Sequence, residues 1–255
     1  MRERHQQRSK GEAAKQRGSE QPIFTLSASR GLHEDMSLKF FWGNSWIKKD
    51  LTKTNVRTIF LGMKKGEETK MAILEAGLDM ASQLGLEGVS IGSLAKAMNM
   101  SKSGLFAHFQ SKENLQIEIL EYAARVFAES VIVPALETKP GIPRIKALVN
   151  NWIDWTSQLT GGCIFVSASA DYSDRPGRVR ECLLRQQNDW IDCLRRIAQS
   201  AITVGEFRKD ADCEQFAFDL YSLLLGFHFF DKLLDDSETR KRQEQALNQL
   251  VANYQ

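Results

Sequence analysis

The chain has 255 residues, of which 42% are apolar and 26% are charged, and its formal net charge is only +2. No uncharged apolar run approaches the roughly eighteen residues that cross a bilayer, and the basic, polar N-terminus lacks the apolar stretch of a secretory signal. These features exclude membrane-spanning and secreted classes and predict a cytoplasmic globular protein with no membrane partner. Because the net charge is small, an anionic partner would have to bind to a local basic patch.

The first 62 residues differ from the remainder of the chain. They hold 12 of the 34 Lys and Arg residues but only 6 of the 32 Asp and Glu residues, and they show no sustained helical or strand periodicity. The first thirty have the composition of a disordered tail. We interpret residues 1–62 as a disordered or mis-annotated extension before a natural start at Met63. The alternative is a genuine basic arm that binds phosphate groups.

From Met63 onward the apolar pattern is helical. Apolar residues recur at three-to-four spacing over 66–84, and Gly85 follows as a C-terminal stop. Serines occupy N-cap positions before three further helices. Ser90 precedes a short helix over 91–98, Ser101 precedes a helix over 102–108, and Ser111 precedes a long helix from Lys112 to Pro134.

The second and third of these helices form a helix-turn-helix pattern. The tight turn between them requires a residue that tolerates a left-handed backbone, and Asn99 is such a residue. Ala95 is small enough for the two helices to approach closely. The outward side chains of the third helix are short or polar, and no acidic residue lies between positions 88 and 112. This pattern favours a helix that enters the major groove of DNA, which is roughly 12 Å wide. A plain three-helix cap with solvated lysines is the alternative.

The segment from Val89 to Leu115, VSIGSLAKAMNMSKSGLFAHFQSKENL, resembles the signature of the TetR family. The resemblance extends over residues 66–126 and implies an all-α fold. In that fold a three-helix DNA-binding domain with a helix-turn-helix joins a helical ligand-binding and dimerisation domain. The resemblance also implies a repressor that binds a palindromic double-stranded DNA operator as a homodimer and dissociates when an unknown small-molecule effector binds.

The same resemblance assigns DNA contacts to individual positions. Ser90 and Lys112 match residues that hold phosphates at the ends of their helices. Phe106 stands where the family most often has tyrosine, so this residue lacks a hydroxyl and either packs in the core or contacts DNA. The expected DNA-binding set is Ser90, Ser101, Lys102, Ser103, Gly104, Phe106, His108 and Lys112.

The domain boundaries follow from these patterns. Residues 63–112 are expected to form the DNA-binding domain, with a connecting helix that continues to about residue 126. Residues 127–255 are expected to form the effector-binding and dimerisation domain. The first of its predicted helices begins at Pro143, and the following helices cover residues 164–170, 178–204, 213–234 and 237–253.

Residues 161–180, GGCIFVSASADYSDRPGRVR, resemble a segment of one TetR subgroup, together with the tryptophans at 152 and 155. Glycines, small residues and aromatic neighbours are able to line a pocket between helices, or they simply allow close helix packing. The candidate effector residues are Trp152, Trp155, Cys163 and Phe165. Cys163 is also a candidate oxidation sensor, although no neighbour in the sequence indicates a depressed thiol pKa.

The helices over 178–204 and 213–234 are the predicted dimer contact. The second of them carries an apolar stripe that looks too wide for one monomer face, and a two-fold contact would be self-complementary. An internal core is the alternative. The predicted dimer residues are Phe216, Leu220, Leu223, Leu224 and Phe227.

Other classes of function have less support in the sequence. An enzyme would need a nucleophile with a base, paired carboxylates or a metal set, and Asp171, Asp174 and His228 lack such spacing. The four cysteines form no CxxC pair, so we expect reduced thiols rather than disulfides. We expect no catalysis, no metal and no other cofactor. The alternative function is a DNA-binding activator or a protein-partnered regulator that senses no small molecule.

Overall fold

The computed structural model describes residues 41–42, 45–46 and 65–255. The chain up to Lys48 is a separate unit, and its described residues form two short strands, β1 (Phe41–Trp42) and β2 (Ser45–Trp46). The strands pair antiparallel, with Phe41 opposite Trp46. Two residues per strand are too few for a sustained alternation in the sequence. The interpretations of residues 1–62 otherwise lie outside the described residues.

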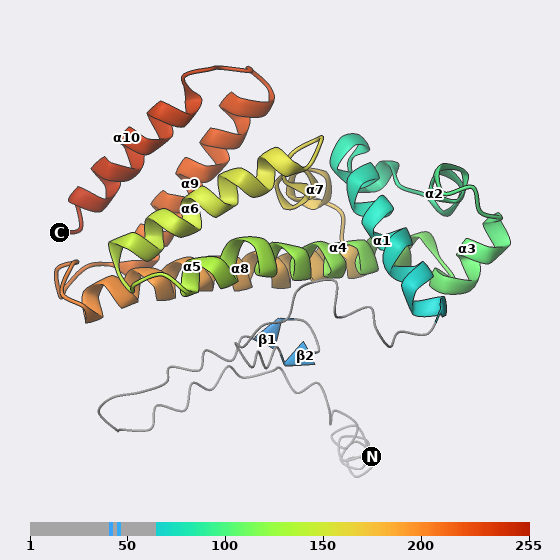
Figure 1. The fold of residues 1–255 in the computed structure, drawn as a ribbon, viewed down its shortest axis with the longest axis horizontal. Helices are drawn as coiled ribbons and strands as arrows, with labels where there is room; N and C mark the ends of the chain where they lie inside the picture. Colours follow the sequence, from blue (N-terminus) through green and yellow to red (C-terminus); the bar gives the residue numbers. More distant parts are fainter. Residues whose placement is uncertain (1–40, 43–44, 47–64) are drawn as a thin grey trace, which may run out of the picture. The chain divides into compact units, whose positions relative to one another are not determined.

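Residues 65–255 are helical (Figure 1), as the sequence predicts. The first helices are α1 (Lys65–Leu84), the 3₁₀ turn η2 (Leu86–Gly88), α2 (Ile91–Ala97), α3 (Lys102–Phe109) and α4 (Lys112–Phe127). Gly85 ends α1 with a φ of 73°, a left-handed conformation in which glycine has no steric penalty. Helix α1 packs on α4, and α2 packs on α3. Ile73 and Leu115 are completely buried in this unit.

The long helix that begins at Lys112 does not end at Pro134, and this prediction was wrong. The chain passes through a π-helical turn, η3 (Ala128–Ile132), into α5 (Val133–Leu136). In the π turn the Val133 N–H donates to the Ala128 carbonyl. Pro134 then lies in the first turn of α5, where its missing N–H is tolerated. The change in hydrogen-bond register therefore lets the helix continue past a proline.

The C-terminal helices follow the predicted order. They are α6 (Ile142–Gln158), α7 (Ile164–Tyr172), α8 (Arg178–Thr203), α9 (Cys213–Lys232) and α10 (Thr239–Ala252). Helix α8 packs against both α4 and α9, and α10 packs against α9 (Figure 1). Over the described part of the chain, no helix is both long and apolar enough to cross a membrane.

Phe127, at the end of α4, is the centre of the aromatic core. Its ring makes edge contacts with Trp155 at 5.7 Å, Phe165 at 5.7 Å and Trp190 at 5.0 Å between ring centroids. These partners belong to α6, α7 and α8. Edge-to-face aromatic pairs stabilise a core by about 0.5–1.5 kcal/mol beyond the burial of their area. The cluster therefore joins α4, which extends from the N-terminal helices, to three helices of the C-terminal part.

Candidate nucleic-acid interface

The turn between α2 and α3 has the geometry that the sequence predicts. Asn99 adopts a left-handed backbone with a φ of 53°, and the Met100 N–H donates to the Ala95 carbonyl over 2.8 Å. Ala95 is buried, as are Leu94 and Leu105 on the two helices. Backbone hydrogen bonds and close packing therefore hold α3 in a defined orientation beside α2.

Serine side chains cap the N-termini of α2, α3 and α4, and the three cap predictions are confirmed. The Ser90 Oγ accepts from the Ser93 N–H at 3.0 Å, and the Ser93 hydroxyl accepts in return from the Ser90 N–H at 2.9 Å. The Ser101 Oγ accepts from the Gly104 N–H at 3.1 Å, and Ser111 caps α4 in the same way. Such a cap stabilises a helix by about 1 kcal/mol.

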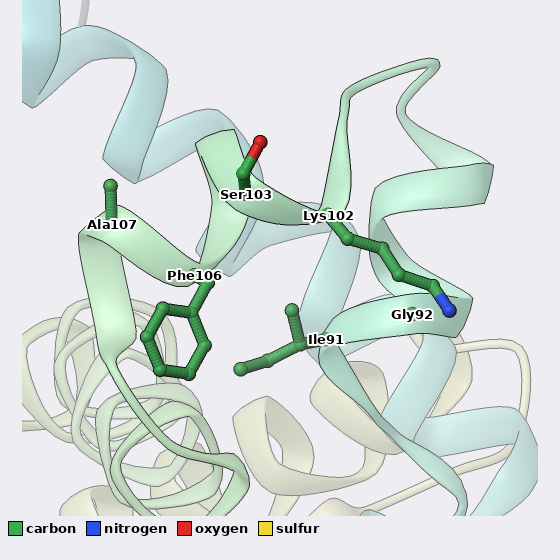
Figure 2. Close-up of a pocket in the computed structure, with 6 residues that line it drawn as sticks. All are labelled: Ile91, Gly92, Lys102, Ser103, Phe106 and Ala107. Atoms are coloured by element: carbon green, nitrogen blue, oxygen red, sulfur yellow. The ribbon is translucent and has the colours of Figure 1, made fainter.

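The predicted DNA-binding residues of α3 gather on one exposed area. Ser101, Lys102 and Ser103 are exposed, whereas Gly104 and His108 are half-buried. Beside them the first turn of α2 and the outer side of α3 enclose an open concavity of about 460 Å³ (Figure 2). Its lining consists of Ile91, Gly92, Lys102, Ser103, Phe106 and Ala107. We call it the α2–α3 concavity. Sequence reasoning missed Ile91 and Gly92 because they belong to the neighbouring helix.

Phe106 lies at the surface, with 52% of the residue exposed. Leu105 and Phe109 occupy the buried positions of the same helix. Figure 2 shows the Phe106 ring and the Ile91 side chain pointing toward one another across the concavity. Of the two interpretations of Phe106, packing in the core is therefore wrong, and contact with DNA stays a prediction.

Cations surround this area. Lys96 and Lys102 are exposed, and the sequence between positions 88 and 112 has no acidic residue. Lys112 is engaged within the protein, because its Nζ donates to the Glu87 carbonyl at 2.8 Å and to Glu87 Oε1 at 2.6 Å. Both side chains of this ion pair are between two fifths and one half exposed. A phosphate that approached Lys112 would therefore compete with Glu87.

Glu87, which sequence reasoning missed, connects the N-terminal helices to α7. Its Oε2 accepts from the Tyr172 hydroxyl at 2.9 Å and lies 3.7 Å from the Arg175 guanidinium. Hydrogen bonds from Lys112 and then from Tyr172 lower the pKa of Glu87 to about 2. These partners lie far apart in the sequence, so no spacing rule could have identified the cluster.

The candidate effector residues are all buried. They are Trp152, Trp155, Cys163 and Phe165. Trp155 and Phe165 meet around Phe127, whereas Trp152 makes a separate edge contact with Phe227, at 6.4 Å between ring centroids. The Cys163 thiol lies beside the Trp155 side chain. The structure therefore brings Trp155, Phe165 and Cys163 together in the aromatic core, with Trp152 apart from them.

The glycine pair before α7 permits two close approaches. A Cβ on Gly161 would lie 1.6 Å from the Ser82 carbonyl oxygen of α1, and a Cβ on Gly162 would lie 2.6 Å from His228 Nε2. The close-packing interpretation is confirmed for both glycines. The Cys163 N–H donates to His228 Nε2 at 3.2 Å. Burial raises the pKa of the Cys163 thiol, which opposes a reactive thiolate at this position.

The predicted dimer residues are not at the surface. Phe216, Leu220, Leu224 and Phe227 are buried, and Leu223 is half-buried. Helix α9 packs between α8 and α10, and the Phe216 ring contacts Phe207 at 5.2 Å and Tyr254 at 5.0 Å. The assignment of the four buried residues to a dimer contact was wrong, because other segments of the same chain cover them. Phe207 and Tyr254 lie on Phe216, and Trp152 of α6 lies on Phe227. The internal-core alternative is correct for these residues.

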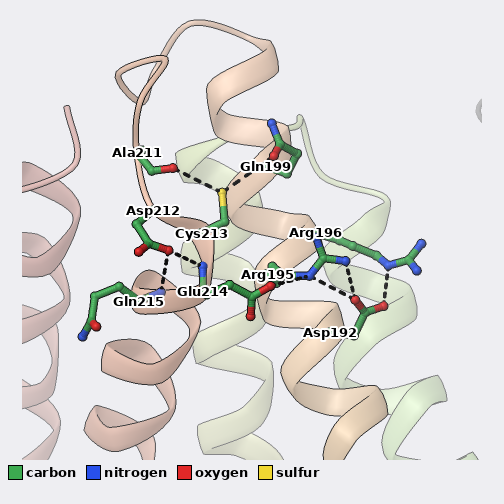
Figure 3. A network of polar contacts seen from close by, with 9 residues as sticks. All are labelled: Asp192, Arg195, Arg196, Gln199, Ala211, Asp212, Cys213, Glu214 and Gln215. Atoms are coloured by element: carbon green, nitrogen blue, oxygen red, sulfur yellow. Dashed lines mark hydrogen bonds and ion pairs between the residues drawn. The ribbon is translucent and has the colours of Figure 1, made fainter.

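A different face of α8 and α9 exposes apolar side chains. Arg195 of α8 pairs with Glu214 of α9 at 3.3 Å and also with Asp192 (Figure 3). The ion pair between Arg195 and Glu214 places the helix face that carries Arg195 beside the helix face that carries Glu214. Residues three or four positions apart lie in a row along one helix face. The exposed apolar residues of these rows are Leu184 and Ile191 on α8 and Phe218, Leu225 and Phe229 on α9. We call them the exposed α8–α9 face; their i, i+4 and i+7 spacing was visible in the sequence.

Two family models match the chain. The first, described as bacterial regulatory proteins of the tetR family, matches residues 73–119, and a tetracyclin repressor-like C-terminal domain matches residues 141–247. The HTH-type transcriptional regulator AcrR of Shigella flexneri is 34% identical over 58 residues, which is 23% of this chain. That match spans 27% of AcrR, so the chain matches about a quarter of this curated relative.

Solved structures share the fold of the whole helical part. A TetR transcriptional regulator from Chloroflexus aurantiacus J-10-FL superposes with a TM-score of 0.66 at 24% identity, covering 74% of this chain and 96% of that one. The structure of AibR in complex with isovaleryl coenzyme A and operator DNA has a TM-score of 0.56 at 24% identity, covering 72% and 96%. The all-α fold with an N-terminal helix-turn-helix is thereby confirmed.

Proposed function

Because the chain belongs to the TetR family of bacterial regulatory proteins, we propose that it is a DNA-binding transcription regulator. Specifically, we propose a repressor that binds a palindromic operator as a homodimer and dissociates when a small molecule binds. Residues 63–112 act as the DNA-binding domain, connected through a helix to about residue 126. Residues 127–255 act as the effector-binding and dimerisation domain. Regulators of this family are not enzymes, and we propose no catalytic activity.

One observation carries the proposal, namely the exposed surface of α3 beside α2. The Asn99 turn and the Ser101 cap fix α3. Apart from Phe106, its outer side chains are small or basic, and no acidic residue interrupts positions 88–112. A helix of this kind is able to enter the major groove while its partner helix crosses the phosphate backbone. Lys102 and the polar caps would then bind phosphates flanking the bases that α3 contacts.

We propose that the homodimer forms through the exposed α8–α9 face. Five large apolar side chains are exposed on this face, and exposed apolar side chains gathered on one face mark an interaction surface. A two-fold axis would bury the same residues on both copies. Phe218→Asp is expected to convert the dimer to a monomer in sedimentation velocity. Lys241→Asp on α10 is the control. An unchanged dimer in Phe218→Asp would contradict the placement of the interface.

We propose that the effector binds in the aromatic core around Phe127. Trp190 supports this site, because its Nε1 is buried and has no hydrogen-bond partner among the described residues, and such donors are normally satisfied. Helix α7 connects this core to the N-terminal helices, with Phe165 on Phe127 and Tyr172 on Glu87. A ligand that displaced α7 would therefore disturb the DNA-binding domain. AibR, which shares the fold, was solved with both a ligand and operator DNA.

The test is a gel-shift titration of the purified full chain with the intergenic DNA upstream of its own gene. A scrambled duplex of the same composition serves as the DNA control. We expect a specific complex that Lys102→Ala weakens and that Lys209→Ala, an equal charge change on an exposed loop, does not. A reporter driven by the same DNA would show repression; increased transcription would establish an activator instead. A folded dimer without specific binding would contradict the proposed function.

A further inference from the structure

The α2–α3 concavity has a lining that differs from the usual surface of a DNA-binding protein. Such surfaces are generally polar and strongly basic. Here Ile91, Phe106 and Ala107 supply apolar side chains, and Gly92 supplies none. The end of the Lys102 side chain lies over Gly92, with Cε at 3.2 Å and Nζ at 3.6 Å from the position of a Cβ on that glycine. The ammonium group of Lys102 therefore lies beside α2 at Gly92, away from the Phe106 ring (Figure 2).

Helix α3 also has few side chains that distinguish bases by hydrogen bonds. Its sequence, KSGLFAHF, contains no Arg, Asn or Gln. Of the residue types that form bidentate bonds with guanine or adenine, it has only the lysine at Lys102. Lys102, Ser103 and His108 are the polar side chains within the helix. An apolar contact is a further way for this helix to distinguish base pairs, because thymine alone presents a methyl group in the major groove.

We propose that the α2–α3 concavity receives the C5-methyl group of a thymine, with Phe106, Ile91 and Ala107 in contact with it. The proposal rests on the proposed function, since it identifies a base that the operator must contain. Charge complementarity indicates that the molecule bound in the concavity is DNA. Lys102 stands beside α2 at Gly92, where a phosphate of the same strand would pass, and no acidic residue lies between positions 88 and 112. Phe106 is therefore a specificity-determining residue.

The size of the effect follows from burial of one methyl group. Transfer of a methyl or methylene group out of water changes an affinity by about fourfold. A dimer on a palindromic site has two such contacts, so removal of both methyl groups is expected to weaken binding by about fifteenfold.

The experiment uses a duplex selected from a random-sequence pool by the purified full chain. Each symmetry-related pair of thymines is replaced in turn by deoxyuridine, which lacks the methyl group and retains every hydrogen-bonding atom. We expect one symmetry-related pair of thymines to show the fifteenfold loss. The same replacements are then measured with Phe106→Ala, whose exposed ring is removable without opening the core, and with Lys102→Ala. Circular dichroism verifies that both variants are folded.

The proposal predicts that Phe106→Ala is insensitive to this deoxyuridine pair, whereas Lys102→Ala binds more weakly yet keeps the full methyl dependence. Equal methyl dependence in wild type and Phe106→Ala would place the methyl contact elsewhere and overturn the proposal. Strong, sequence-specific binding with every deoxyuridine replacement within twofold would also overturn it while leaving the proposed function intact. Failure of the pool to yield any preferred sequence would overturn the proposed function itself and this inference with it.

Discussion

Replacement of Gly161 by alanine tests the contact between α1 and the segment before α7. The added Cβ would lie 1.6 Å from the Ser82 carbonyl oxygen and 2.3 Å from the Ser82 carbonyl carbon. Both neighbours are backbone atoms, so no side-chain rotation relieves the overlap. The two segments would have to separate by roughly 2 Å to restore an ordinary contact of 3.4 Å.

The cost of Gly161→Ala has two parts. Overpacking of a well-packed contact costs about 1–3 kcal/mol. Separation of the segments also breaks the hydrogen bond from the Gly161 N–H to Ser82 Oγ, which is 3.3 Å long and contributes about 1 kcal/mol. We therefore expect the free energy of unfolding to fall by about 2–4 kcal/mol.

Urea unfolding followed by circular dichroism measures this loss. The midpoint of Gly161→Ala should fall by about 1–2 M for an ordinary urea dependence. Gly66→Ala is the matched control, because a Cβ there meets no atom within 4 Å, and its midpoint should be unchanged or slightly raised. Equal midpoints for Gly161→Ala and wild type would refute the packing of α7 against α1.

Three further predictions concern charges and thiols. The ionised Glu87 stabilises the fold above pH 4.5, and this contribution is lost as the pH falls through about 2. In an acid titration the wild type should therefore lose more stability than Glu87→Gln. The difference should be less than about 1 kcal/mol, because the Glu87 side chain is 49% exposed. Lys112→Ala should weaken binding to all DNA sequences and reduce the salt dependence of binding; an altered sequence preference with an intact salt dependence would contradict this role. Iodoacetamide should modify the half-buried Cys213 before Cys163, which is 2% exposed; equal rates by mass spectrometry would show that α7 opens.

The DNA-binding part of the fold was predictable because its signals are local. The left-handed Asn99 turn and the caps at Ser90 and Ser101 depend on residues within a few positions of one another. Helical periodicity likewise located the C-terminal helices to within a few residues of their observed ends. Local chemistry therefore determined the order of the helices and the polar residues that α3 exposes, but it left the position of Phe106 undecided.

Features that depend on tertiary packing were not predictable. The apolar stripe of α9 that includes Phe216 has the pattern of any buried face, and periodicity does not say whether other segments of the same chain or a second chain cover it. Pro134 indicated a helix end because a π turn leaves no signature in the sequence. Glu87 gave no signal, since Lys112 and Tyr172 reach it only after folding.

The measurement that tests the central claim most directly is a fluorescence-anisotropy titration of the full chain with its selected duplex and with a scrambled duplex. At about 0.15 M salt, where exposed charges are largely screened beyond a Debye length, we expect the selected duplex to bind at least about a thousandfold more tightly. Equal affinity for the two duplexes, with a folded dimer verified in the same buffer, would contradict the account of α3 as a sequence-specific DNA-binding helix.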